Sequence, residues 1–147
     1  MDRKELARSC FQEGYNCAQA VVTAFADETG LDRETLSKMS VGLGGGVGRM
    51  REVCGTVSGM AMVLGLIYGT DDPDSKNSVY PIVQEACEKF REQNGSIVCR
   101  ELLAGVPVSS GSTAEPRTAE FYKKRPCAEL VENAVQIVEE ILREKDR

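Results

Sequence analysis

The sequence predicts an all-α protein: one helical bundle of about five to six helices, with a glycine-rich loop before its central helix. Apolar residues recur at three- and four-residue spacing along nearly the whole chain, which is the period of an amphipathic helix. No segment alternates apolar and polar residues for long enough to predict a strand. The chain has 147 residues, the size of one average domain, and shows no internal repeat. Residues 1–147 are therefore expected to form a single domain.

The first third of the chain predicts two helical regions. An N-terminal pair of helices, or one kinked helix, is expected to begin after a cap at Asp2 and to break at Gly14. A second, short helix is expected over 31–39, with Asp32 at its start. The segment 41–48 that follows is rich in glycine, so its backbone is the least restricted part of the chain.

The central helix is expected over 51–68. Its Gly55 and Gly59 lie four residues apart on one face, which allows a neighbouring helix to approach closely. This apolar segment is shorter than the roughly 20 residues that a membrane span requires, and it contains three glycines. We therefore expect a buried helix and no membrane association.

Three further features complete the expected fold. Pro73 and Ser78 mark the start of a helix that ends at Gly95, with Pro81 in its first turn or at a kink. Ser96 is expected to cap a short helix that carries Cys99. The longest loop is expected over 105–116, and the last helix over 126–143.

Charge and composition exclude several classes of partner. The formal net charge is −5, so the overall field repels nucleic acid and anionic lipid. The N-terminal residues form an acidic amphipathic pattern rather than a secretion signal, which predicts a cytoplasmic protein. In a reducing cytoplasm, cysteines more often serve metal binding or catalysis than structural disulfides. The sequence specifies no oligomeric state.

Cysteine placement is the strongest functional signal, because the chain has six cysteines and no histidine. Four of them, Cys17, Cys54, Cys99 and Cys127, fall where helices are expected to begin. Unpaired N–H groups and the helix dipole stabilise a thiolate there, and the thiolate is the form that attacks, is oxidised or binds a metal. Cys10 and Cys87 lie inside apolar helical patterns and are interpreted as core residues.

Familiar cysteine motifs are absent. The sequence has no C-x-x-C, no haem-attachment motif and no histidine to complete a zinc site or a Cys-His nucleophile. Cys54 combines a glycine-rich approach, a position at a helix start and two nearby arginines, Arg49 and Arg51. Because each of these favours the thiolate, we predict that Cys54 is the most reactive thiol. Other cations lie beside Cys99 and Cys127, although ordinary solvated side chains explain such neighbours equally well.

The glycine-rich segment offers a second candidate site. Its backbone N–H groups at Gly45, Gly46 and Gly48, together with Arg49, would suit a small anion or the edge of a cofactor. No strand precedes the segment and no Lys-Ser or Lys-Thr follows it, so a nucleotide-binding fold is excluded. The alternative is a turn that packs closely against its neighbours.

Four segments together resemble a known family. They are Gly14 to Ala20 with Cys17, Gly44 to Gly59 with Cys54, Cys99 to Leu103, and Cys127. The pattern is similar to that of the redox-active C_GCAxxG_C_C family, which is small, cytoplasmic and named for four cysteines. Thr56 stands where the family motif has alanine. Similar segments in a split-Soret cytochrome imply an iron–sulfur site, without haem in this chain.

These observations leave several functional interpretations open. The leading one is a redox-active protein in which Cys17, Cys54, Cys99 and Cys127 hold an iron–sulfur cluster or another soft metal, or form a reversible thiol–disulfide centre. It would serve electron transfer with a redox partner protein and requires no organic substrate of its own. The alternatives are a non-catalytic zinc-binding module and a helical interaction protein with structural cysteines.

Overall fold

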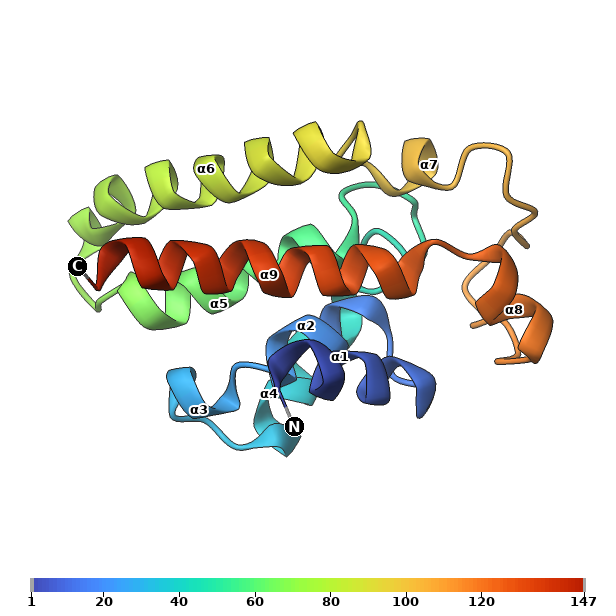
Figure 1. Cartoon of the computed structure of the whole chain (residues 1–147), viewed down its shortest axis with the longest axis horizontal. Helices are drawn as coiled ribbons and strands as arrows, with labels where there is room; N and C mark the ends of the chain where they lie inside the picture. Colours follow the sequence, from blue (N-terminus) through green and yellow to red (C-terminus); the bar gives the residue numbers. More distant parts are fainter. Residues whose placement is uncertain (1, 147) are drawn as a thin grey trace.

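The structure, a computed structural model, describes residues 2–146 as an all-α fold (Figure 1). Within these residues the only β-type pairing is an isolated bridge between Val53 and Val98. Six helices have seven or more residues: α1 (Arg3–Gln12), α2 (Cys17–Thr23), α4 (Arg33–Ser40), α5 (Gly55–Tyr68), α6 (Lys76–Asn94) and α9 (Cys127–Lys145). Three are shorter: α3 (Ala26–Thr29), α7 (Cys99–Leu102) and α8 (Ala119–Lys124). The all-α prediction is confirmed.

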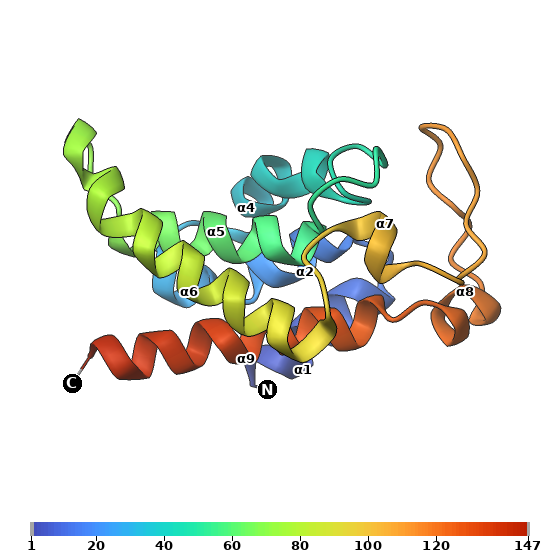
Figure 2. The ribbon, with the colours of Figure 1, turned by 90° about the horizontal axis from the view of Figure 1, so that it is seen from above.

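The long helices α5, α6 and α9 pack against one another, and α2 packs against both α5 and α9 (Figures 1 and 2). Helix α1 lies along α9, and α4 lies on α2. The apolar stripe of α9 is buried over most of its length, as its helical period predicts. Figure 2 shows that the glycine-rich segment, α7, α8 and the long loop between them gather at one end of the bundle. The other end consists of helices and their short connections.

The N-terminal region is a pair of separate helices rather than one kinked helix. Asp2 caps α1 by accepting a hydrogen bond from the backbone N–H of Glu5, as expected. Gly14 has a left-handed backbone with φ of +105°, which turns the chain between α1 and α2. Asn16 then caps α2 by accepting a hydrogen bond of 2.9 Å from the N–H of Gln19.

The central helix begins four residues later than expected, at Gly55. Residues before it are extended because their backbone pairs with another segment: Cys54 N donates to Ile97 O at 2.8 Å, and Cys99 N donates to Glu52 O at 2.6 Å. Gly59 lies where a Cβ would meet Val21 Cβ at 3.1 Å. The expected close helix contact therefore exists, between α5 and α2.

Three local predictions need correction. Pro81 is the sixth residue of α6, so it lies beyond the first turn, with its ring exposed to solvent. Val98, not Ser96, is the N-cap of α7; the Ser96 hydroxyl instead accepts a hydrogen bond from Val98 N and donates one to Glu101. The short helices α3 and α8 were not expected. No helix within residues 2–146 is both long enough and apolar enough to span a membrane.

Candidate functional site

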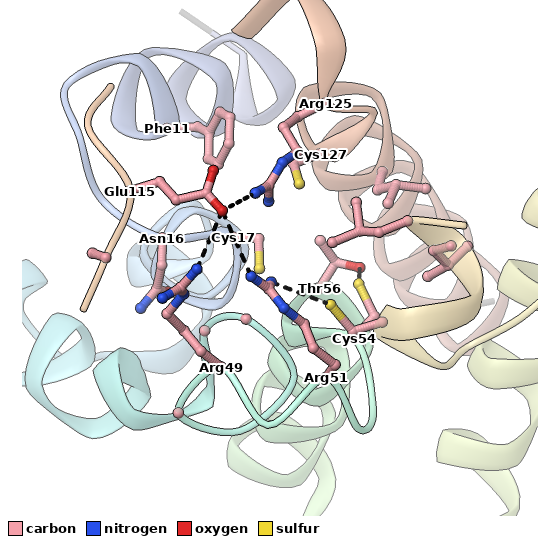
Figure 3. Close-up of a pocket in the computed structure, with 18 of the residues that line it drawn as sticks. Phe11, Asn16, Cys17, Arg49, Arg51, Cys54, Thr56, Glu115, Arg125 and Cys127 are labelled. Carbon is pink, nitrogen blue, oxygen red and sulfur yellow. Dashed lines mark hydrogen bonds and ion pairs between the residues drawn. The ribbon is translucent and has the colours of Figure 1, made fainter. Parts of the chain in front are cut away.

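A cavity of about 370 Å³ lies at the end of the bundle where the loops gather. All four cysteines expected to act together, Cys17, Cys54, Cys99 and Cys127, line it. Figure 3 shows the Cys17, Cys54 and Cys127 sulfurs directed toward this space from different elements. Cys10 and Cys87 are not part of the lining. The structure therefore gathers the four cysteines from positions that are far apart in the sequence.

Each of the four cysteines stands at the start of a helix. Cys17, Cys99 and Cys127 are the first residues of α2, α7 and α9, and Cys54 is the N-cap of α5. The helix-start prediction is confirmed for every one of them. The starts of four helices thus face one pocket, and the first N–H groups of α2, α5 and α9 contribute positive potential to it. In α7 the first N–H groups are paired, because Cys99 N and Arg100 N donate to Glu52 O and Arg51 O.

Glycines allow the backbone to approach these side chains. A Cβ on Gly55 would lie 2.6 Å from Cys17 Sγ, and one on Gly46 would lie 2.8 Å from Cys99 Cβ. A Cβ on Gly44 would collide with the side chain of Asn16, which donates a hydrogen bond of 2.9 Å to Val41 O. These contacts are shorter than real Cβ atoms tolerate, so the three positions require glycine on steric grounds.

The glycine-rich segment winds as a left-handed turn. Residues 45–49 all have φ between +56° and +74°, and Arg51 has φ of +61°. The turn is closed by bonds such as Gly48 N to Gly42 O at 2.9 Å and Glu52 N to Gly46 O at 3.0 Å. Left-handed backbone is unfavourable for non-glycine residues, above all for β-branched ones such as Val47, so the segment stores strain beside the pocket.

Cys17 and Cys54 form an unequal thiol pair. A hydrogen bond with the Cys54 side chain is the main cause that lowers the pKa of Cys17, and the backbone N–H of Gly45 lowers it further against the effect of burial. The same hydrogen bond, together with burial, raises the pKa of Cys54 well above its ordinary value. Of the two sulfurs, Cys17 is therefore the one that ionises first as pH rises, and Cys54 keeps its proton to higher pH.

The other two thiols are held protonated. Burial is the main cause that raises the pKa of Cys99, although Arg51 Nη1 lies 3.9 Å from its sulfur and acts in the opposite direction. Burial also raises the pKa of Cys127 to about 11, with Arg125 opposing it. The raised pKa of Cys54 contradicts the expectation that it is the most reactive thiol. Arg49 and Arg51 do not pair with Cys54, and its closest polar partner is Thr56 Oγ1 at 3.0 Å.

Three arginines converge on a single carboxylate at the mouth of the cavity (Figure 3). Glu115 Oε1 lies 3.2 Å from Arg49 Nη2, 3.9 Å from Arg51 Nη2 and 2.6 Å from Arg125 Nη2. The Arg125 side chain is only 7% exposed. The pKa of Glu115 is lowered despite its partial burial, because Ser109 and Arg125 stabilise the ionised form. The three positive charges exceed the one negative charge that faces them.

The four candidate residues of the glycine-rich segment lie in two different places. Gly45, Gly48 and Arg49 line the cavity, whereas Gly46 packs behind Cys99 and does not. Arg49 donates hydrogen bonds to the carbonyls of Ser109, Gly111 and Thr113, so it also holds the long loop. A role of these four residues in binding a cofactor stays a prediction.

Cys10 and Cys87 lie elsewhere in the fold. Cys10 is buried in the core, 3.6 Å from the Thr23 hydroxyl and 3.8 Å from Arg33 Nη2, so its surroundings are less apolar than expected. Cys87 is half-buried on α6, where burial raises its pKa.

Sequence reasoning missed several functional residues. Glu115 lies in the long loop, and only its isolated acidic side chain between serine, threonine and proline residues distinguishes it. Arg117 donates to the carbonyls of Phe11 and Tyr15 and stacks on the ring of Phe121, which fixes the wall of the cavity. In the sequence, Thr56 stands out only as a departure from the family motif, although it is fully buried and contacts Cys54.

Metal binding by the four cysteines also stays a prediction. In residues 2–146, no three Cys, Asp or Glu side chains are arranged so as to hold one metal ion. The cysteines line a common cavity without converging on a single point, so binding of one tetrahedral ion would require their side chains to move.

Comparison with known proteins gives one match. The model of the family described as "putative redox-active protein (C_GCAxxG_C_C)" matches residues 15–141, which include all four cysteines of the cavity. No curated protein and no solved structure matches the chain.

Proposed function

Because the chain belongs to the C_GCAxxG_C_C family of redox-active proteins, we propose that its redox activity resides in a reversible dithiol–disulfide centre formed by Cys17 and Cys54. The observation that carries the proposal is that Cys17 Sγ lies against Gly55, the residue next to Cys54, in a cavity that both cysteines line. Their pKa values are shifted in opposite directions, which distinguishes the two thiols. A thiolate with a lowered pKa is the attacking sulfur in thiol–disulfide exchange, and a protonated neighbour is suited to resolve the mixed disulfide.

In the proposed thiol–disulfide exchange, Cys17 reacts first and Cys54 second. Cys17 attacks a disulfide of the oxidant, forms a mixed disulfide and releases one thiolate, which takes a proton from solvent. Cys54 then loses its proton and attacks the Cys17 sulfur, releasing the second thiolate. The protein dithiol is oxidised by two electrons and the oxidant disulfide is reduced to two thiols. Cys99 and Cys127 supply two further thiols to the same cavity.

The proposal is tested by locating the disulfide. The reduced protein is equilibrated in glutathione redox buffers, quenched with acid, alkylated and mapped by mass spectrometry. We expect Cys17 and Cys54 to lose their free thiols together, and Cys17→Ala to abolish this two-electron oxidation. Cys87→Ala removes a half-buried thiol outside the cavity, and it should leave the oxidation of Cys17 and Cys54 unchanged. Oxidation confined to other cysteines, or none at any potential of the buffers, would contradict the proposal.

A pH series tests the charge assignment separately. Cys17 should be alkylated by iodoacetamide faster than the other cavity cysteines below pH 8, because only its pKa is lowered. In Cys54→Ala the hydrogen-bond donor is lost, so the pKa of Cys17 should rise and its labelling should shift to higher pH. If Cys54→Ala leaves the pH profile of Cys17 unchanged, the pair does not share the proton as described.

A four-thiolate iron–sulfur centre is the second candidate. Two observations favour it: all four sulfurs line one cavity, and three arginines surround that cavity with positive charge. Cys17, Cys54, Cys99 and Cys127 would hold the cluster, which would supply one-electron transfer. Anaerobic purification with metal and sulfide analysis distinguishes the candidates. Iron and sulfide in equal amounts support the cluster, zinc alone supports the binding module, and a metal-free protein that still forms the Cys17–Cys54 disulfide supports the first proposal.

The proposed location and partner follow from this chemistry. We assign the protein to the cytoplasm, where a reducing environment keeps the dithiol form available. A redox partner protein would accept or supply the electrons. The negative net charge does not favour nucleic acid as a partner.

A further inference from the structure

The cluster of Arg49, Arg51 and Arg125 at the mouth of the cavity, which we name the arginine cradle, carries more positive charge than its surroundings balance. Glu115 is the carboxylate that faces all three guanidinium groups, at 3.2, 3.9 and 2.6 Å. Arg125 Nη2 is fully buried and, although close to Glu115, does not make a well-aligned hydrogen bond. Glu115 is therefore an ion-pair partner of Arg125 without the well-aligned, charge-assisted hydrogen bond that best stabilises a buried guanidinium.

Glu115, the carboxylate bound in the arginine cradle, belongs to a segment that makes few backbone contacts. Residues 105–118, which we name the strap, carry Glu115 across the cavity mouth, and residues 107–114 are exposed. No backbone–backbone hydrogen bond involves residues 107–115. The strap is held by the ion pairs of Glu115, by the hydrogen bonds that Arg49 donates to strap carbonyls, and by Arg117, which donates to Phe11 O and Tyr15 O. Within the strap, Glu115 also bonds with Ser109. An anion that replaces Glu115 would therefore take over its ion pairs without breaking regular secondary structure, while Arg49 and Arg117 keep their hydrogen bonds to backbone carbonyls.

The cradle and the thiol pair open into the same cavity. Arg49, Arg51 and Arg125 line it together with Cys17 and Cys54. Its volume of about 370 Å³ is within the range of small-molecule sites, roughly 300–1,000 Å³. A macromolecular surface would not enter a cavity of this size with the strap in place, whereas a small disulfide would reach both the cradle and the sulfurs.

We infer that the arginine cradle binds the carboxylate of a small anionic disulfide, that Glu115 occupies this place in its absence, and that such a disulfide is the substrate of the thiol pair. This inference rests on the proposed dithiol function. The substrate carboxylate displaces Glu115 and pairs with the guanidinium groups, while Cys17 attacks the nearer substrate sulfur. Cys54 completes the exchange, so that one disulfide is reduced to two carboxylate-bearing thiols and the protein gains one disulfide.

Three symmetrical disulfides of similar length test the inference: 3,3′-dithiodipropionate with two negative charges, 2-hydroxyethyl disulfide with none, and cystamine with two positive charges. The rate of Cys17–Cys54 oxidation by each is divided by the rate at which the same disulfide is reduced by free dithiothreitol, an uncharged dithiol. We expect the anionic disulfide to exceed cystamine by at least about tenfold after this correction. Because the net charge of the protein is −5, long-range attraction alone would give the opposite order.

Three variants test which residues cause the preference for the anionic disulfide. Glu115→Gln removes the internal competitor and no cradle charge, so it should raise the rate with dithiodipropionate several-fold. Arg125→Gln should reduce the preference for this disulfide, and far-UV circular dichroism checks that the variant is folded. Arg100→Gln is the matched control, because Arg100 pairs with Glu52 outside the cavity. It should leave the order of the three disulfides unchanged.

The outcomes separate the two proposals. If the Cys17–Cys54 disulfide forms with all three reagents and the corrected rates are equal or favour cystamine, the cradle does not select the substrate and this inference is wrong, while the dithiol function stands. If none of the three oxidises the pair, both proposals are wrong. If Glu115→Gln slows the reaction with dithiodipropionate, Glu115 is not a competitor and the displacement step is wrong.

Discussion

The two ends of the bundle are built on opposite principles. Where α5 and α6 connect and α9 ends, buried side chains such as Val63, Leu64, Ile137 and Ile141 pack against one another, and the connections are short. At the cavity end, four thiols, an arginine cluster and a left-handed turn are enclosed by long loops. Packing at the first end stabilises the folded state by burying apolar surface. The polar groups and the left-handed turn at the cavity end destabilise it through desolvation and strain.

The contrast shows how a small helical domain accommodates a cavity lined by thiols and charged side chains. The unfavourable elements lie at helix starts and in loops, where they do not interrupt the apolar contacts of α2, α5 and α9. Substitutions at the bundle end should therefore change stability with little effect on the thiols. Substitutions at the cavity end should change thiol chemistry with smaller effects on stability.

The largest effect is expected at the contact between α5 and α2. Gly59→Leu should destabilise the protein by more than about 3 kcal/mol, because even a Cβ would meet Val21 Cβ at 3.1 Å and Ala18 O at 3.3 Å. Gly65→Ala is the matched control in the same helix, since nothing lies within 4 Å of its Cβ position. It should stabilise the protein by about 0.5–1 kcal/mol through helix propensity.

Urea denaturation measures both variants. Equal stability of Gly59→Leu and the parent protein would mean that α2 and α5 are not in close contact. Loss of stability in Gly65→Ala would show that the two glycines do not differ as described.

The next effect is a loss of stability in alkali that originates in the cavity. The fold raises the pKa of Cys127 from 9.0 to about 11. Below pH 9 both states hold the proton, and between pH 9 and 11 the unfolded chain releases it while the native protein keeps it. Stability must therefore fall as pH rises through this window, by about 2–3 kcal/mol from this thiol.

Denaturation of the reduced protein at pH 8 and pH 10.5 checks this expectation. Cys127→Ala should show a smaller difference between the two pH values than the parent protein, whatever its own stability at pH 8. Cys10→Ala serves as the control for loss of a buried thiol outside the cavity. An unchanged difference in Cys127→Ala would contradict the assignment.

A smaller effect is expected at Thr56, whose hydroxyl lies 3.0 Å from Cys54 Sγ. Thr56→Val keeps the shape of the side chain and removes the hydroxyl, so it should cost about 1 kcal/mol. Since the Thr56 hydrogen bond acts to lower the pKa of Cys54, its loss should raise that pKa further and slow alkylation of Cys54 at pH 9. Faster labelling of Cys54 in this variant would reverse the assigned role of Thr56.

The smallest effect is relief of strain in the left-handed turn. Val47 has φ of +65° and its side chain is largely exposed, so Val47→Gly should stabilise the protein by about 0.5 kcal/mol. Val108→Gly, at an exposed valine outside the left-handed region, should be neutral or slightly destabilising. Thermal denaturation of the two variants and the parent protein shows whether each substitution raises or lowers stability. Destabilisation by Val47→Gly would mean that the turn is not strained at this position.

The sequence predicted the bundle end more completely than the cavity end. Helical period and the pair Gly55 and Gly59 were sufficient to predict a buried central helix, because local spacing determines which residues share a helix face. The placement of Cys17 and Cys127 at helix starts was also predictable, from the residues that precede them.

The chemistry of the cavity depended on contacts that no spacing reveals. Arg49 and Arg51 are close to Cys54 in sequence, yet the left-handed backbone between them directs both side chains to Glu115. Glu115 itself lies in a loop without periodicity, so nothing local identified it. The pairing of Cys17 with Cys54 likewise depends on how α2 packs against α5. Reactivity was therefore assigned to the wrong member of the pair.

The backbone pairing of Cys54 with Ile97 and of Cys99 with Glu52 also has a consequence for the order of assembly. Cys17 and Cys54 both precede the segment around Cys99 in the chain, so they are synthesised before it. Cys127 follows later still, at the start of the last helix. A nascent chain therefore holds both thiols before Arg125 and the strap exist, so we expect the cavity to close over them only when the last third of the chain has been made.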